Sequence, residues 1–263
     1  MPARRRRIVA HLLAIALLVA ACGDDPHWYF ADADHEHHAA WSYQGDTGPE
    51  HWGDLDSAYR LARTGRSQSP IDIRPAAAIS VPLPRTRFRY TPEPATFLNN
   101  GHTLQHNEAP GSWLEIDDER YALKQFHFHT PSEHSIDGAL LDAEIHLVHQ
   151  GASGEAVVVA ILVRSGAKNR ALEGVRGTLP REGSTKTLTG SIDPAELLPE
   201  SHRLFRYTGS FTTPPCTENV EWFVLEQPIE VAAEDIEELT ALVGNNNRPV
   251  QPLNGRRVRV IEP

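Results

Sequence analysis

The sequence contains very little sulfur. Of its 263 residues, only 2 are cysteine and only 1 is methionine. Two cysteines are too few for a disulfide-rich scaffold, a four-cysteine zinc ribbon or an iron–sulfur cluster. Histidine, by contrast, occurs 14 times. This high count is the first indication of a bound metal.

Long apolar runs and an excess of positive charge are also missing. The longest apolar stretch, Ile8–Ala21, is shorter than the roughly 20 residues of a membrane-spanning helix, which excludes a multi-span membrane protein. The 25 basic residues are outnumbered by 35 acidic ones, so no nucleic-acid partner is expected. Hydrophobic residues at 40% and charged residues at 23% are typical of a globular chain and exclude general disorder.

The first 21 residues have the order of a bacterial export signal. Arg4–Arg7 form a positive segment, Ile8–Val19 form an apolar segment, and Ala20-Ala21 precede Cys22 as in a lipobox. We therefore expect a signal peptide over residues 1–21, cleavage before Cys22 and acylation of its thiol. The chain would then be exported and lipid-anchored on the periplasmic side of a bacterial membrane. The alternative is an ordinary signal peptide that ends near a cysteine.

Residues 22–40 show no helical or strand periodicity and are expected to form a tether. Its histidines alternate with acidic residues and can bind zinc loosely, as in a periplasmic zinc buffer: His27, His35, His37 and His38. A solvated linker is the simpler interpretation, because nothing fixes the geometry of these ligands. Deleting residues 24–40 would separate the two hypotheses, since an enzyme would keep its catalysis.

Residues 41–263 show no break in composition and are expected to form a single domain. Short segments rich in β-branched and aromatic residues alternate with turn residues, which predicts strands. Helices are expected at Ala233–Val243 and at Lys168–Arg176. The fold class is therefore mainly β with short peripheral helices. The expected strands are Thr86–Tyr90, Ala95–Asn99, Trp113–Ile116, Tyr121–His129, Ala143–His149, Ala156–Arg164, Val220–Gln227 and Val258–Ile261.

Two of these strands carry a pattern typical of a metal site. In a strand, His127 and His129 point to the same face, with Cβ atoms roughly 7 Å apart. His146 lies on a second strand and supplies a third nitrogen. Three neutral nitrogen ligands leave a zinc ion with one open position, which is typical of a catalytic site. Gln125 and Glu144 each lie two residues before a candidate ligand and can hold its second ring nitrogen.

Several motifs around these histidines resemble those of α-class carbonic anhydrases of the bacterial type. The motifs are QFHFHTPSEH at 125–134, EIHLVH at 144–149 and TTPPCTENVEW at 212–222. Supporting blocks lie at 41–43, 48–52, 68–71, 99–102 and 247–252. The resemblance runs from Trp41 to about Ile261, and the motifs agree with the family in order and spacing.

The resemblance implies a large, twisted, mostly antiparallel central sheet with a Zn²⁺ cofactor at the base of a conical cleft. The implied metal ligands are His127, His129 and His146, and a backbone carbonyl of Asn246 would orient His129. The implied reaction is the reversible hydration of carbon dioxide to bicarbonate and a proton by zinc hydroxide attack. Carbonic anhydrase is itself the reference case for a zinc ion that lowers the pKa of its bound water to about 7.

The resemblance also implies roles for residues around the metal. Thr212 would accept a hydrogen bond from the zinc hydroxide and donate its own proton to Glu133, which orients the hydroxide. His102 matches the position of a proton shuttle, and a histidine titrates in the right range. Thr213 would lie beside the substrate. An apolar wall for carbon dioxide is implied at Val148, Val157, Phe211 and Trp222.

Cys216 departs from the family pattern. Bacterial members usually pair this cysteine with one earlier in the chain, at the position that Ala62 occupies here. Because Cys22 is expected to carry lipid, Cys216 is expected to be a free thiol.

The main alternative to an enzyme is a non-catalytic zinc-binding module on the same fold. Such relatives typically lack one or more of the zinc histidines. Here all three histidines are present together with Glu133 and Thr212. The sequence therefore favours a carbonic anhydrase.

Overall fold

The structure is a computed structural model that describes residues 38–82, 84–172 and 179–261. The expected signal peptide, Cys22 and the tether up to residue 37 lie outside these residues. The chain from His38 to Pro263 clusters as one compact unit. Among the residues described, no helix has the length and apolar character needed to cross a membrane.

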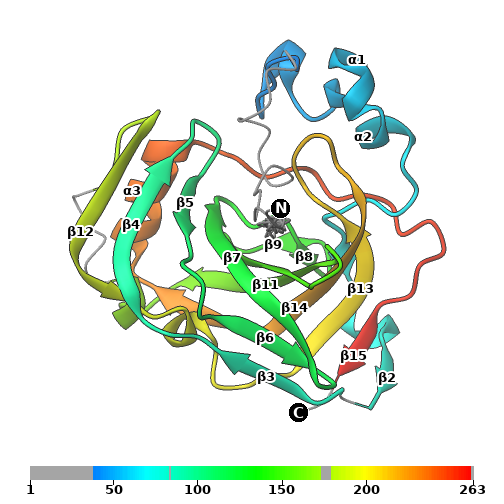
Figure 1. Cartoon of the computed structure of the whole chain (residues 1–263). Coiled ribbons are helices and arrows are strands. Elements are labelled where there is room, and N and C mark those ends of the chain that lie inside the picture. The colour runs from blue at the N-terminus through cyan, green and yellow to red at the C-terminus, as the bar shows by residue number, and fades with distance from the viewer. Residues whose placement is uncertain (1–37, 83, 173–178, 262–263) are drawn as a thin grey trace, which may run out of the picture. The chain divides into compact units, whose positions relative to one another are not determined.

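Three long strands form the centre of the main sheet (Figure 1). β11 (Ala156–Ser165) lies between β10 (Ala143–Gln150) and β14 (Glu218–Val231). The first eight residues of β11 are apolar and buried. A continuous apolar run of this length is typical of a strand that is covered on both faces, and it explains why β11 occupies the middle of the sheet.

The main sheet has 12 strands, ten of them in the order β12-β4-β5-β7-β10-β11-β14-β13-β15-β2. β6 pairs with both β3 and β7 off this path, and a small second sheet has the order β1-β8-β9. The remaining strands are β1 (Asp72–Ile73), β2 (Ile79–Val81), β3 (Thr86–Arg89), β4 (Glu93–Asn99), β5 (Leu104–Asn107), β6 (Trp113–Ile116), β7 (Glu119–His129), β8 (Ser135–Ile136), β9 (Ala139–Leu140), β12 (Ser184–Ile192), β13 (Leu204–Ser210) and β15 (Arg259–Ile261).

The structure confirms the expected mainly β fold. Most strand pairs of the main sheet are antiparallel, and the exceptions among the described strands are β11 with β14 and β15 with β2. The eight strands predicted from sequence correspond to β3, β4, β6, β7, β10, β11, β14 and β15, with ends that differ by a few residues. The sheet is therefore mixed but mostly antiparallel.

Helices are few and short, as expected. α3 spans Ala233–Val243, the range predicted from the sequence. Within the predicted helix at 168–176, the structure shows only the 3-10 turn η4 (Arg170–Leu172), and residues 173–178 are not described. The other helices are η1 (Gly45–Thr47), α1 (Trp52–Leu55), η2 (Ser57–Tyr59), α2 (Leu61–Thr64), η3 (Pro75–Ala77) and η5 (Pro194–Leu197).

The two faces of the central strands differ in chemistry. Phe126 and Phe128 of β7 belong to the main hydrophobic cluster, together with Leu147 of β10 and Leu239 of α3. Because side chains alternate along a strand, the residues between these phenylalanines and beyond them point to the opposite face. That second face carries buried polar groups, and it is where the candidate metal ligands lie.

Cys216 is buried and forms no disulfide. Its backbone carbonyl accepts a hydrogen bond from the Gln68 amide. Burial raises the pKa of the Cys216 thiol to about 11, because the thiolate would lose its hydration. In the folded chain this thiol is therefore neutral and inaccessible at physiological pH.

We expect the Cys22→Ser variant of the full chain to show one thiol per chain after denaturation and none when native. The rise in pKa from 9.0 to about 11 alone reduces the thiolate fraction about 100-fold at pH 8, and burial slows the reaction further. Thiol titration at pH 8 with and without denaturant measures this difference. A covalent dimer on non-reducing gels, or equal labelling of native and denatured protein, would contradict the prediction.

Candidate metal centre

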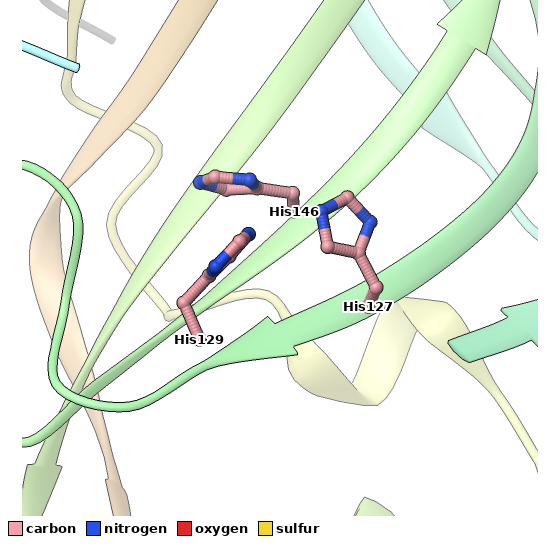
Figure 2. Close-up of side chains that lie close together, drawn as sticks. All are labelled: His127, His129 and His146. Carbon is pink, nitrogen blue, oxygen red and sulfur yellow. The ribbon is translucent and has the colours of Figure 1, made fainter. Parts of the chain in front are cut away.

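Three histidines converge on the polar face of the sheet (Figure 2). His127 and His129 lie two residues apart on β7, and His146 of β10 is directly opposite His127 in the antiparallel register. The ring centroids are 5.0 Å (His127–His129), 5.2 Å (His127–His146) and 4.6 Å (His129–His146) apart. One nitrogen of each ring lies within 4.8 Å of the other two, which is close enough for all three to bind one ion.

One nitrogen of each ring, the outer nitrogen, donates a hydrogen bond to an acceptor beside the triad. The other, the inner nitrogen, is the one that could bind the shared ion. His127 Nδ1 donates to Gln125 Oε1 at 2.8 Å, and His129 Nδ1 donates to the Asn246 carbonyl at 2.7 Å. His146 Nε2 donates to Glu144 Oε1 at 2.7 Å. A neutral imidazole carries one proton, so these contacts leave a lone pair on each inner nitrogen. The buried Nε2 of His129 has no hydrogen-bond partner, as expected for a nitrogen that is a metal ligand.

The environment keeps these rings neutral. Burial lowers the pKa of His127 well below 6.5 and lowers that of His129 to about 4. Burial also lowers the pKa of His146, although the neighbouring Glu144 opposes the shift. Only a neutral imidazole can bind a metal, and three such nitrogens with a further open position fit a catalytic zinc site. The donor set of this chain therefore fits Zn²⁺.

Glu144 is the carboxylate behind His146. Its Oε1 also accepts from His134 Nδ1 at 2.6 Å, and its Oε2 accepts from the backbone N–H groups of Glu133 and His134. Burial alone would raise the pKa of Glu144, but electrostatic attraction to the His134 and His146 rings and the hydrogen bonds from them hold it well below 4.5. Glu144 is therefore an ionised acceptor that fixes the orientation of His146.

Glu133 lies beside the converging nitrogens. Its Oε1 accepts from the backbone N–H of Arg248 at 2.8 Å, and its Oε2 lies 3.5 Å from His129 Nε2 and 3.9 Å from His146 Nδ1. Burial raises the pKa of Glu133 to about 7, and the nearby His146 ring and Thr212 hydroxyl oppose this shift. The structure thus places Thr212 and Glu133 together, next to the three histidines.

The sheet register corrects one residue of the expected apolar wall. Val148 lies two residues from His146 on the same face of β10, and its neighbour across the strand pair is Val158. Val157 is instead opposite His149 and packs in the main hydrophobic cluster on the other face. The prediction for Val157 is therefore wrong by one position, and Val158 is the residue that faces the metal centre.

The remaining predicted substrate-binding residues lie within β14 and just after the end of β13. Trp222 is buried opposite Val158, and its ring lies 4.8 Å from the His146 ring. Its indole N–H donates to the Ser210 carbonyl at 3.0 Å, which fixes the plane of the ring. Phe211 and Thr213 flank the buried Thr212 and are both partly exposed.

His102 is connected to the metal centre through Asn246. The Asn246 side-chain amide donates to the His102 backbone carbonyl at 2.9 Å, while the Asn246 backbone carbonyl accepts from His129 Nδ1. The His102 ring is partly exposed and stacks on Trp41, with centroids 3.8 Å apart and planes 8° from parallel. The structure therefore places His102 at the border between the site and solvent.

Sequence reasoning missed the part played by Arg248. This residue is 1% exposed, and its guanidinium donates to Gln68 Oε1 and to the Ser69 and Ala62 carbonyls. These contacts fix the chain at Arg248, whose backbone N–H binds Glu133. In the sequence this position shows only the family pattern of the block at 247–252, because the contacts of Arg248 join residues more than 100 positions apart.

The fold and the site define a mainly β protein with a buried centre of three histidines, of the type that leaves a metal with an open position. Residues 47–262 match the family described as "Eukaryotic-type carbonic anhydrase". The chain belongs to the α-carbonic anhydrase family and is a carbonic anhydrase enzyme, a family whose members hydrate carbon dioxide.

Relatives and solved structures agree with this assignment. A carbonic anhydrase of Nostoc sp. is 42% identical over 223 residues, which cover 83% of this chain and 84% of the relative. A carbonic anhydrase of Neisseria gonorrhoeae is 38% identical over 254 residues, with 96% and 97% coverage. The α-carbonic anhydrase of Thermovibrio ammonificans in complex with sulfanilamide is 42% identical, with a TM-score of 0.81 and coverage of 85% and 99%.

We expect His146→Ala to bind one zinc ion fewer per chain than the wild type and to lose carbon dioxide hydration. Loss of one nitrogen breaks the triad and leaves Glu144 without one of its partners. Zinc content is measured by mass spectrometry after gel filtration, with His202→Ala, an exposed histidine, as the control. Unchanged zinc content together with normal activity would contradict the ligand assignment.

Proposed function

We propose that this chain hydrates carbon dioxide reversibly to bicarbonate and a proton, with zinc held by His127, His129 and His146. The observation that carries the proposal is a set of three buried, neutral imidazole rings. In each ring the outer nitrogen donates a hydrogen bond, to Gln125, Asn246 or Glu144, and the inner nitrogen keeps its lone pair. When bound, zinc lowers the pKa of a coordinated water to near 7 and so supplies hydroxide at neutral pH.

Glu133 and Thr212 are proposed to orient the attacking oxygen. In this proposal the Thr212 hydroxyl donates a hydrogen bond to the nearby Glu133 carboxylate, so that its oxygen can accept a hydrogen bond from a group in the site. This requires ionised Glu133, and a nearby cation lowers the pKa of a carboxyl group. Such fixed orientation of a nucleophile lowers the entropic part of the barrier.

The substrate is proposed to lie against an apolar wall. Carbon dioxide has no charge and no net dipole, so it gains little from polar contacts. Val148, Val158 and Trp222 are buried on the face that carries His146, and Phe211 lies beside Thr212. An apolar surface next to the metal also excludes water that would compete for the same space.

The reaction itself tests the proposal. Stopped-flow measurement of carbon dioxide hydration with the purified full chain should show zinc-dependent activity that a chelator removes and added zinc restores. Zinc binding without hydration would support the non-catalytic module instead. Activity that disappears on deletion of residues 24–40 would point to the histidine-rich tether rather than to the triad.

We expect His102→Ala to lower kcat by at least about tenfold in weak buffer while kcat/KM changes little. Each turnover releases a proton, and His102 is the partly exposed titratable group that Asn246 links to the centre. Added imidazole should restore kcat, since it carries the proton in place of the side chain. Equal losses in both parameters would indicate a disturbed metal site, and His202→Ala is the matched histidine control.

We also propose that the chain is exported and anchored through lipid on Cys22, on the periplasmic side of the membrane. The support is the order of Arg4–Arg7, the apolar segment and Ala20-Ala21 before the cysteine. The Cys22→Ser variant should move from the membrane fraction to the soluble fraction and should no longer incorporate labelled palmitate. Identical fractionation of variant and wild type would contradict the anchor.

A further inference from the structure

A second cluster of metal-binding side chains lies on the opposite face of the sheet from the histidine triad. On β5, Gln105 is opposite His127 while the next residue, His106, is opposite Phe126. The His106 ring therefore points to the apolar side, where it lies 4.9 Å from the Phe126 ring and 5.5 Å from the Phe97 ring. This cluster is separate from the site of the proposed function.

Two carboxylates face the same nitrogen of His106. His106 Nε2 lies 2.7 Å from Glu93 Oε1 and 3.6 Å from Glu108 Oε2. One atom from each of the three residues lies within 4.8 Å of the other two. The side chains of His106 and Glu108 are each 1% exposed, whereas that of Glu93 is 15% exposed and forms the side open to solvent.

In each of the three residues, the second nitrogen or oxygen atom, which is not part of the cluster, forms a hydrogen bond. His106 Nδ1 donates to the Thr96 carbonyl at 2.8 Å, and Glu93 Oε2 accepts from the Ala109 N–H at 2.9 Å. Glu108 Oε1 accepts from the Ser112 hydroxyl at 2.6 Å. Support of this kind is what surrounds metal ligands in proteins, because it fixes the tautomer and the direction of each ligand.

The three atoms that face one another, His106 Nε2, Glu93 Oε1 and Glu108 Oε2, are all hydrogen-bond acceptors when the ring is neutral, so they repel one another unless a cation lies between them. Because Nδ1 carries the proton of a neutral ring, Nε2 presents a lone pair to carboxylate oxygens that also only accept. Glu108 Oε2 is buried and has no hydrogen-bond partner. An unpaired carboxylate oxygen is costly to bury, so a positive charge is needed here.

The cation can be a proton or a metal ion. Burial opposes a charge on the His106 ring, but the nearby Glu108 and Glu93 carboxylates and the Thr96 carbonyl outweigh it and raise the pKa of His106 above 6.5. A proton on Nε2 satisfies Glu93 at 2.7 Å but leaves Glu108 Oε2 at 3.6 Å, beyond a good hydrogen bond. A divalent ion would satisfy all three atoms at once.

We propose that Glu93, His106 and Glu108 form a second zinc site with a structural role. One imidazole and two carboxylates suit zinc, and the solvent side at Glu93 leaves room for a water as fourth ligand. The ion would join the start of β4 to the end of β5 and the loop that follows it. This site does not touch the reacting atoms, so its loss would change stability rather than catalysis.

Glu108→Gln tests the proposal with little change in shape. The full chain is stripped with a chelator, equilibrated with excess zinc, passed through gel filtration and analysed for zinc by mass spectrometry. We expect Glu108→Gln to bind one zinc ion fewer than the wild type, with its hydration rate unchanged. Glu119→Gln, an exposed residue of β7, removes the same charge and should keep the wild-type zinc content.

Thermal unfolding separates this site from the triad and from the tether. Zinc should raise the Tm of His146→Ala, which lacks a complete triad, and should raise it less in the double variant His146→Ala/Glu108→Gln. His106→Gln serves as a second variant, and retained hydration activity shows that either single variant is folded. Equal zinc content in the wild type, Glu108→Gln and His106→Gln would overturn the proposal and assign the cluster to a buried, protonated His106.

Discussion

The metal centre depends on the buried carboxylate of Glu144. Four donors converge on its two oxygens: two histidine rings and two backbone N–H groups. Such saturation is what allows an ionised carboxylate to remain in the interior, because a buried charge without partners is strongly destabilising. The carboxylate in turn selects the tautomer of His146 and fixes the backbone of Glu133, whose side chain lies beside the three rings. The fully paired carboxylate of Glu144 thus positions both a candidate metal ligand, His146, and the neighbouring residue Glu133.

The alternation of side chains in a strand explains how an apolar core and a polar centre share the same strands. On β7, Phe126 and Phe128 pack in the hydrophobic cluster, while the histidines next to them meet on the other face. A shift of one residue in the register would exchange the two sets completely. The pairing with β10, which places His146 opposite His127, therefore sets the geometry of the site. Catalysis and stability depend on the same strand pairing.

Much of the fold was predictable because apolar and polar residues alternate clearly in the central strands. The edge strand β12 was not, since most of its residues are exposed Thr, Ser, Lys and Gly with no apolar face. The triad was predictable because its members carry their supporting residues close by in sequence, as Gln125 does for His127. Arg248 was not, because its contacts with Gln68 and Glu133 join segments far apart in the chain. Val157 was misplaced because a continuous apolar run has no alternation to show which residues face the metal.

Acid acts in the same direction on the triad histidines and on Glu144: in both cases the folded state loses stability as the pH falls. The triad histidines have lower pKa values in the folded chain than in the unfolded chain. As the pH falls below 6.5, the unfolded chain therefore binds protons that the folded chain does not bind, and for His129 this continues down to about pH 4. Glu144 has a lowered pKa as well, so its contribution to stability is present above about 4.5 and is lost as the pH falls through its folded value. Zinc requires the same neutral rings and the same ionised carboxylate. Zinc binding would therefore be coupled to folding, because the charge states that stabilise the three histidines and Glu144 in the folded chain are those that a metal ion requires.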